Sequence, residues 1–278
     1  MAADVSATDT GFIDALRVKP GHGPHLDRRD PRDRLGVDDK DGAKTTVAEM
    51  VSELDGLQNR LWAEAKRSVL LVLQGMDTAG KDGAIRRVLS GLNPQGCVVT
   101  SFKAPSDADA AHDYLWRVHQ VCPPRGHLGV FNRSHYEDVL AARFVGAESH
   151  EECRRRYRHI RDFEQMLTDE GTTVVKVFLH LSKEEQRIRL QARIDDPTKS
   201  WKFNQADLDV RAHWDGYQSA YEEVITETST DAAPWYIVPA DRKYVRDVAV
   251  AALLVSTFRR LDPQIPRPDP AIDGIVVE

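Results

Sequence analysis

VLLVLQGMDTAGKDGAIRRVLSG, residues 69–91, is the stretch that decides the fold. It begins with an apolar run typical of a buried strand and ends in a pattern typical of an amphipathic helix. The connection has the spacing Gly75-x4-Gly80-Lys81, that of a loop whose backbone N–H groups and following helix N-terminus surround a phosphate. An ordinary glycine-rich turn without a ligand is the alternative. Given the flanking strand and helix, we expect phosphate binding by Gly75, Thr78, Ala79, Gly80, Lys81 and Asp82.

Two carboxylates set this loop apart from the usual phosphate-binding loop. Asp82 follows the lysine, where Ser or Thr normally reaches Mg²⁺, and Asp77 lies inside the loop. Because Mg²⁺ prefers hard oxygen ligands, we expect Asp77, Asp82 or both to take over as metal ligands. The cofactor that the loop predicts is therefore Mg²⁺.

Composition narrows the class of protein. The chain has 278 residues and a formal net charge of −6, which argues against general nucleic-acid binding. Its three cysteines are scattered and include no C-x-x-C pair, as is typical of a reducing compartment. The first ten residues do not resemble a signal peptide, and the longest apolar stretch, 248–255, is too short to span a bilayer. We expect a cytoplasmic protein that binds neither nucleic acid nor membrane.

The order of elements predicts an α/β fold. Strand-like segments alternate with helical ones, which favours a three-layer domain with a central parallel five-stranded sheet. The strands are expected at 69–73, 97–102, 127–131, 173–181 and 235–239. Helices are expected at 46–67, after the loop, from 106, after 134, at 149–171 and at 242–260, with capping boxes starting at Thr46, Ser106 and Ser149.

The same pattern predicts the domain organisation. Residues 1–44 are rich in Gly, Pro, Asp and Arg, and we expect an extended N-terminal arm. The α/β domain is expected over 45–260, with a helical lid at about 183–230, and a proline-rich tail over 261–278.

Ligands in parallel sheets bind beyond the carboxyl ends of the strands, where the loop at 75–82 and several charged residues should meet. Lys103 and the pair Asn132-Arg133 each follow a strand. The lid carries Arg189 and Arg193 on one helix face, and Lys199 and Lys202 after the break at Pro197. Charged lids that close over phosphates stabilise the transferring charge.

Each of these functional interpretations has an alternative in which the residues have a purely structural role. Asn132, Arg133, Glu137 and Asp138 could simply cap the next helix, and the lid could be a solvated helix with balanced charges. The arginine run at 154–161 goes around its helix, so we interpret it mainly as solvated surface, with a polyanion groove as the alternative. Aromatic residues at helical spacing are expected in the core and not as a base-stacking platform: Trp214, Tyr217 and Tyr221.

Four segments together resemble polyphosphate kinase family 2 over roughly residues 45–260. They are GMDTAGKDG in the loop, FNRSHYEDVL after the third strand, RIDDPTKSWKF in the lid and PWYIVPADRKYVRD at the fifth strand. The resemblance implies a thymidylate-kinase-like P-loop kinase fold, dependence on Mg²⁺, and phosphoryl transfer between inorganic polyphosphate and nucleoside mono- or diphosphates. It also implies a homo-oligomer, often a tetramer.

The resemblance carries over to single positions. Asp77, Lys81, Arg133 and Arg193 match the family's essential residues. Asn132 stands where other subgroups carry Asp, and Glu137 stands where other branches carry Asn. By resemblance, Glu137 favours the subgroup that accepts both AMP and ADP. With Lys103, these two residues are expected to contact the nucleotide. The segment Ala141–Val145 departs from the family pattern.

Two rival functions remain, and the second belongs to a different functional class. One is an ATP-dependent small-molecule or nucleotide kinase on the same fold, against which the loop Asp82 argues. The other is a non-catalytic polyphosphate-binding module, which would have no need of metal ligands.

Overall fold

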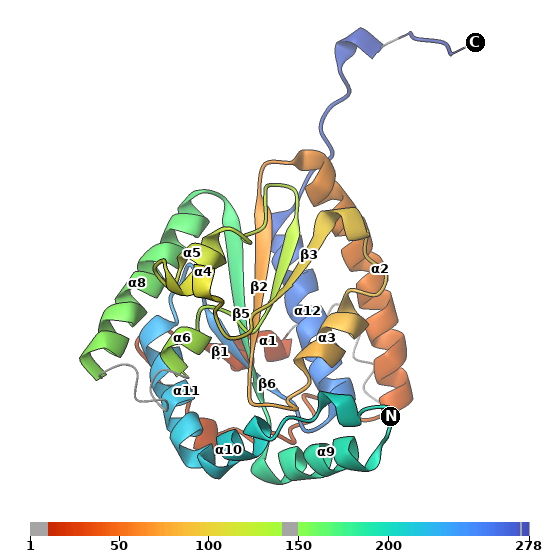
Figure 1. Ribbon diagram of the computed structural model, residues 1–278. Helices are drawn as coiled ribbons and strands as arrows, with labels where there is room; N and C mark the ends of the chain where they lie inside the picture. The colour runs from red at the N-terminus through yellow and green to blue at the C-terminus, as the bar shows by residue number, and fades with distance from the viewer. Residues whose placement is uncertain (1–10, 141–149, 273, 278) are drawn as a thin grey trace.

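The computed structural model describes residues 11–140, 150–272 and 274–277 (Figure 1). The strands are β1 (Arg17–Val18), β2 (Ser68–Gln74), β3 (Cys97–Ser101), β4 (Leu128–Asn132), β5 (Thr172–His180) and β6 (Trp235–Pro239). The helices are α1 (Gly11–Leu16), α2 (Lys40–Glu64), α3 (Lys81–Val88), α4 (Asp107–Ala110), α5 (Trp116–His119), α6 (Glu137–Leu140), α8 (His150–Asp169), α9 (Lys183–Asp195), α10 (Ala206–Ala212), α11 (Trp214–Thr228) and α12 (Lys243–Leu261). Short 3₁₀ turns lie at Leu26–Arg28, Pro94–Gly96, Ser200–Lys202 and Pro270–Ile272.

The sheet has the strand order β1-β6-β5-β2-β4-β3. All neighbouring pairs are parallel except β1–β6, which is antiparallel. The loop strand β2 lies between β4 and β5 and is buried along its whole length, as a doubly covered parallel strand should be. Five strands were expected, and the sixth, β1, was missed because two residues give no readable alternation.

Helices cover both faces of the sheet and form the expected three layers (Figure 1). Apolar residues of α2 and α12 build the core on one face, where Leu54, Leu61 and Phe258 are fully buried. Those of α8 and α11 build the core on the other face, around Phe178 and Trp235. No helix in the described ranges is both long enough and apolar enough to cross a bilayer.

Residues 11–39 correct the expectation of an extended arm. They form α1, β1 and a 3₁₀ turn, and bury Ile13, Leu16 and Val18 against the domain. The following helix begins at Lys40 and not at Thr46, because the Asp39 side chain caps it by accepting from the amides of Asp41 and Gly42.

The other helix boundaries also differ in part from expectation. The capping box between Ser106 and Asp109 is confirmed, but it opens a helix of one turn, α4, and a second short helix, α5, follows it. The capping residue Ser149 and the atypical segment 141–145 lie outside the described residues.

Candidate active site

The backbone of the loop after β2 requires glycine at two positions. Gly75 has φ of 148°, and a Cβ there would lie 2.9 Å from the carbonyl oxygen of Leu179. Gly80 has φ of 100°, and a Cβ there would lie 1.8 Å from Nη1 of the buried Arg246. Both glycines are therefore required by backbone conformation and by close approach. The guanidinium of Arg246 packs against the loop at Gly80. No spacing in the sequence indicated this contact.

The inner surface of the loop offers unsatisfied donors. The amide of Ala79 donates to the carbonyl of Met76 at 3.0 Å, whereas those of Asp77, Thr78 and Gly80 donate to no backbone carbonyl in the described part of the chain. The hydroxyl of Thr78 is buried without a hydrogen-bond partner, and φ at this residue is 67°. Orphaned donors of this kind at a helix N-terminus form an anion site.

Lys81 lies folded back into the same loop. Its Nζ donates to the carbonyl of Gly75 at 2.6 Å, and only 8% of the residue is exposed. Burial, and then repulsion from Arg133, lower the pKa of Lys81, while Asp77 and Glu137 counteract them. A phosphate placed against the loop would supply the missing counter-charge.

The two loop carboxylates each meet a residue that follows β4. Asp77 Oδ1 accepts from Nη2 of Arg133 at 2.5 Å, and Asp82 Oδ1 accepts from Nδ2 of Asn132 at 2.7 Å. Lys202 of the lid lies 4.0 Å from the second carboxylate. The structure thus brings together most of the residues expected at the carboxyl edge of the sheet.

Arg133 is held in a left-handed conformation with φ of 62°, an uncommon backbone for a residue with a side chain. It also faces Glu137, at 3.8 Å between Nη1 and Oε2. Burial raises the pKa of Glu137, against the opposing pull of Arg133 and Lys81. The side-chain amide of Gln74 is oriented so that its nitrogen donates to Oε1 of Glu137 at 3.0 Å and its oxygen accepts from the hydroxyl of Ser134 at 3.1 Å.

A buried polar network holds the segment that follows Arg133 in place. His135 Nε2 lies 3.3 Å from Oε1 of Glu164, and Tyr136 donates to the same oxygen at 2.8 Å. Lys176, in the middle of β5, donates to Glu164 Oε2 at 2.5 Å and to the carbonyl of Thr228 at 2.7 Å. Glu164 and Lys176 are almost completely buried, so the network fixes His135 and Tyr136, the two residues that follow Arg133 and Ser134 in the chain.

Arg189 corrects an expectation about the lid. Its Nε donates to Glu185, its Nη1 to the loop carbonyls of Thr78 and Ala79, and its Nη2 to the carbonyls of Ala240 and Asp241. With all its donors engaged inside the protein, Arg189 ties α9 to the phosphate loop and to the end of β6. The sequence suggested a phosphate ligand, because a guanidinium suits phosphate and carbonyl oxygens equally well.

The other lid residues lie nearer the surface. Arg193 faces Asp207 at 3.5 Å, and Lys199 pairs with Asp196. Burial, and then the charge of Asp77, raise the pKa of Asp207, so this carboxylate belongs to the same electrostatic cluster. Nothing in the pattern of the segment singled out Asp207.

Two further expectations concern residues beside the loop. Lys103 is exposed beyond β3, and no described contact joins its side chain to the loop. Trp214 and Tyr221 of α11 are buried in the core as predicted, and Tyr217 packs against the same cluster. Trp214 also borders a cavity that is described below. Burial, and then the charges of Glu137 and Asp77, raise the pKa of Tyr217, which places its ring beside the charged cluster.

The donor set also permits the metal that the sequence predicts. In the described ranges no three His, Cys, Asp or Glu side chains gather into a metal cage. Mg²⁺, however, commonly takes only one or two carboxylates and completes its shell with water and phosphate oxygens. Asp77 and Asp82, on the rim of an anion site, fit that requirement.

Comparison with known proteins agrees with this geometry. Residues 37–266 match the family described as Polyphosphate kinase 2 (PPK2). An AMP/ADP-polyphosphate phosphotransferase of Meiothermus ruber is 49% identical over 263 residues, covering 94% of this chain and 98% of that protein. An ADP-polyphosphate phosphotransferase of Rhodopseudomonas palustris is 48% identical and covers 80% and 81%. The crystal structure of polyphosphate kinase 2 from Arthrobacter aurescens superposes with a TM-score of 0.89, at 44% identity and 92% coverage of both chains. The resemblance seen in the sequence motifs is confirmed, and the chain belongs to the polyphosphate kinase 2 family.

Proposed function

We propose that this protein is a Mg²⁺-dependent phosphotransferase that moves a phosphoryl group between inorganic polyphosphate and the nucleotides AMP and ADP. The observation that carries the proposal is the anion site of the loop, with orphaned donors and a buried lysine, next to the pair Asp77–Arg133. The names of the two relatives above supply the substrates.

Positioning and charge neutralisation do most of the work in phosphoryl transfer. In our proposal the loop amides and Lys81 hold the phosphates, and Arg133 neutralises charge on the transferring group. Arg193 approaches from the lid, and Arg189 keeps the loop in shape. Asp77 and Asp82 would hold Mg²⁺, which would supply positive charge to neutralise the phosphates.

In the free protein, the polar side chains of the site bind one another. Arg133 is occupied by Asp77, and Asn132 by Asp82. Substrate phosphates would take the place of Asp77 beside the guanidinium of Arg133, which would leave the Asp77 and Asp82 carboxylates able to hold Mg²⁺. Such an exchange avoids leaving an unpaired charge in a partly buried site at any stage.

Glu137 is our proposed determinant of acceptor range. It stands beside Arg133 at the place where the acceptor's phosphates would arrive, and the relative named for both AMP and ADP is consistent with a dual acceptor. Lys103 and Asn132 remain proposed nucleotide contacts. We also propose a cytoplasmic homo-oligomer; Cys97, Cys122 and Cys153 form no disulfide bond in the described chain, which suits a reducing compartment.

The test incubates purified protein with MgCl₂, polyphosphate and either AMP or ADP, and resolves the nucleotides by chromatography. We expect ATP from ADP, and ADP followed by ATP from AMP. Lys81→Ala should reduce turnover by about 10²-fold or more, since a charged donor at the transferring phosphate is removed. The matched control Lys66→Ala, an exposed lysine at the opposite end of β2, should retain full activity.

Two outcomes would overturn the proposal. Transfer from ATP to a small acceptor with no transfer from polyphosphate would identify an ordinary ATP-dependent kinase. Binding of polyphosphate without transfer in the presence of Mg²⁺ would identify a non-catalytic binding module.

A further inference from the structure

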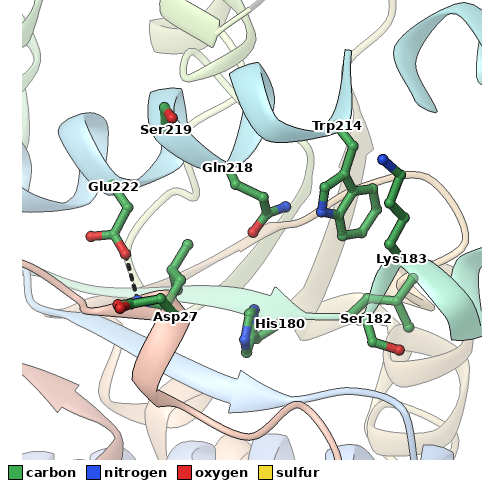
Figure 2. Close-up of a pocket in the computed structure, with 10 residues that line it drawn as sticks. Asp27, His180, Ser182, Lys183, Trp214, Gln218, Ser219 and Glu222 are labelled. Carbon is green, nitrogen blue, oxygen red and sulfur yellow. Dashed lines mark hydrogen bonds between the residues drawn. The ribbon is translucent and has the colours of Figure 1, made fainter. Parts of the chain in front are cut away.

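A cavity lies between the start of α9, one face of α11 and the N-terminal segment around Leu26, and no residue of the phosphate loop lines it. Its volume is about 470 Å³, within the usual range for small-molecule sites. Figure 2 shows Trp214 and Gln218 pointing from α11 towards the strand end that carries His180. Lys183, the first residue of α9, closes one side, and the N-terminal segment around Leu26 closes the other.

Two buried polar atoms in the lining have no partner. His180 is 7% exposed, and its Nε2 contacts the carbonyl of Arg29 at 3.0 Å while Nδ1 has no hydrogen-bond partner in the described chain. Nε2 of Gln218 is likewise buried and unpaired. Nε2 of Gln218 is a donor, whereas Nδ1 of His180 is an acceptor because Nε2 of its ring donates to Arg29. A buried polar atom without a partner costs about 1–3 kcal/mol, and a ligand that completes its hydrogen bond removes that cost.

The chemistry of the lining favours a neutral, flat ligand. Trp214, Leu26 and Leu181 supply apolar surface, and Trp214 offers a ring for stacking. Burial lowers the pKa of His180, so its imidazole is uncharged near neutral pH. The charged residues that line the cavity are one lysine and two acids, Asp27 and Glu222, a balance that disfavours a polyanion.

The cavity and the phosphate site use different faces of one helix. Trp214, Gln218 and Glu222 recur at a spacing of four and line the cavity. Tyr217 and Tyr221 lie on the adjacent face, towards the charges of Asp77 and Glu137. A ligand in the cavity would therefore not occupy the phosphate loop.

We propose that this cavity is a second binding site, which takes a neutral nitrogen heterocycle of purine size. The heterocycle stacks on Trp214, accepts a hydrogen bond from the amide of Gln218 through a ring nitrogen, and donates a second hydrogen bond from an N–H group to Nδ1 of His180. The wall formed by Lys183 brings such a ligand against the start of the lid helix, whose N-cap Ser182 is bound to Asp241. The proposal does not depend on the identity of the phosphoryl donor.

Adenosine is a suitable probe, because it carries the heterocycle without phosphates. Equilibrium dialysis of the full chain with adenosine should give saturable binding, with ribose as the non-binding comparison. Gln218→Leu removes the unpaired donor at similar size and should weaken binding about fivefold to tenfold, the value of one hydrogen bond. Ser219→Trp, at an exposed position on the rim, should block the cavity and abolish binding.

Matched variants separate this site from the rest of the protein. Gln165→Leu changes an exposed glutamine on α8 and should leave adenosine affinity unchanged. Arg133→Ala disturbs the proposed phosphate site and should also leave it unchanged. The proposal is overturned if adenosine does not bind at millimolar concentration, if Gln218→Leu binds as tightly as the unmodified protein, or if Arg133→Ala loses the binding.

Discussion

Lys176→Met tests whether the buried network behind Arg133 is a coupled ion pair. Lys176 is fully buried and donates to Glu164, Tyr136 and the carbonyl of Thr228. Methionine fills similar space but leaves the Glu164 carboxylate, 2% exposed, with only His135 and Tyr136. Removing one partner of a buried pair costs about 3–5 kcal/mol, and we expect a loss of that size in the free energy of unfolding.

The assay is urea denaturation followed by tryptophan fluorescence, with Glu164→Gln and the double variant alongside. In the double variant no charge is left unpaired, so it should be more stable than the two single losses added together predict, by about 1–3 kcal/mol. Lys44→Met, at an exposed lysine, should not change the transition measurably. A loss below about 1 kcal/mol for Lys176→Met, or strict additivity in the double variant, would refute the reasoning.

Three further predictions follow from the site. Arg189→Lys keeps the charge but loses the planar fork that binds four carbonyls, so we expect activity as low as in Arg189→Leu; rescue by lysine would instead indicate direct phosphate contact. Glu137→Asn should change the ratio of AMP to ADP turnover by about tenfold while thermal stability is kept, and an unchanged ratio would remove Glu137 from acceptor selection. Burial opposes ionisation of Glu164, but Lys176 and His135 outweigh it and lower its pKa, so its stabilisation is present above the ordinary value of about 4.3 and is lost as pH falls further. Acid titration of Glu164→Gln should therefore show a shallower fall in stability than the unmodified protein, and parallel curves would contradict this.

Local patterns predicted the parts of the site that are contiguous in sequence. The loop between β2 and α3 is confirmed because glycine spacing, an apolar strand and an amphipathic helix all lie within 23 residues of each other, at 69–91. Contacts between segments that are distant in the sequence could not be predicted from local patterns. Arg246 beneath Gly80, and Asp207 beside Arg193, depend on how α12 and α10 pack against the loop and the lid.

Residues with several suitable partners were the hardest to assign. Arg189 has the right charge for phosphate, yet its burial behind the loop gives it carbonyl partners instead. Asp39 caps the helix in place of Thr46, because the helix begins at Lys40, six residues before Thr46. The sequence pattern did not show where the helix begins. The pairing of β1 likewise depends on the free edge of β6 and not on its own two residues.

The pairing of β1 with β6 has a consequence for synthesis on the ribosome. Val18 lies opposite Trp235, which emerges roughly 220 residues later. At the usual rate of translation, the N-terminal segment waits on the order of ten to forty seconds for the strand on which it docks. During that time its apolar residues Ile13 and Leu16 have no native partner surface from β6. A segment made well before β6 thus reaches its native place only after β6 has been made, and nascent chains stalled before residue 235 should expose it to proteases and chaperones.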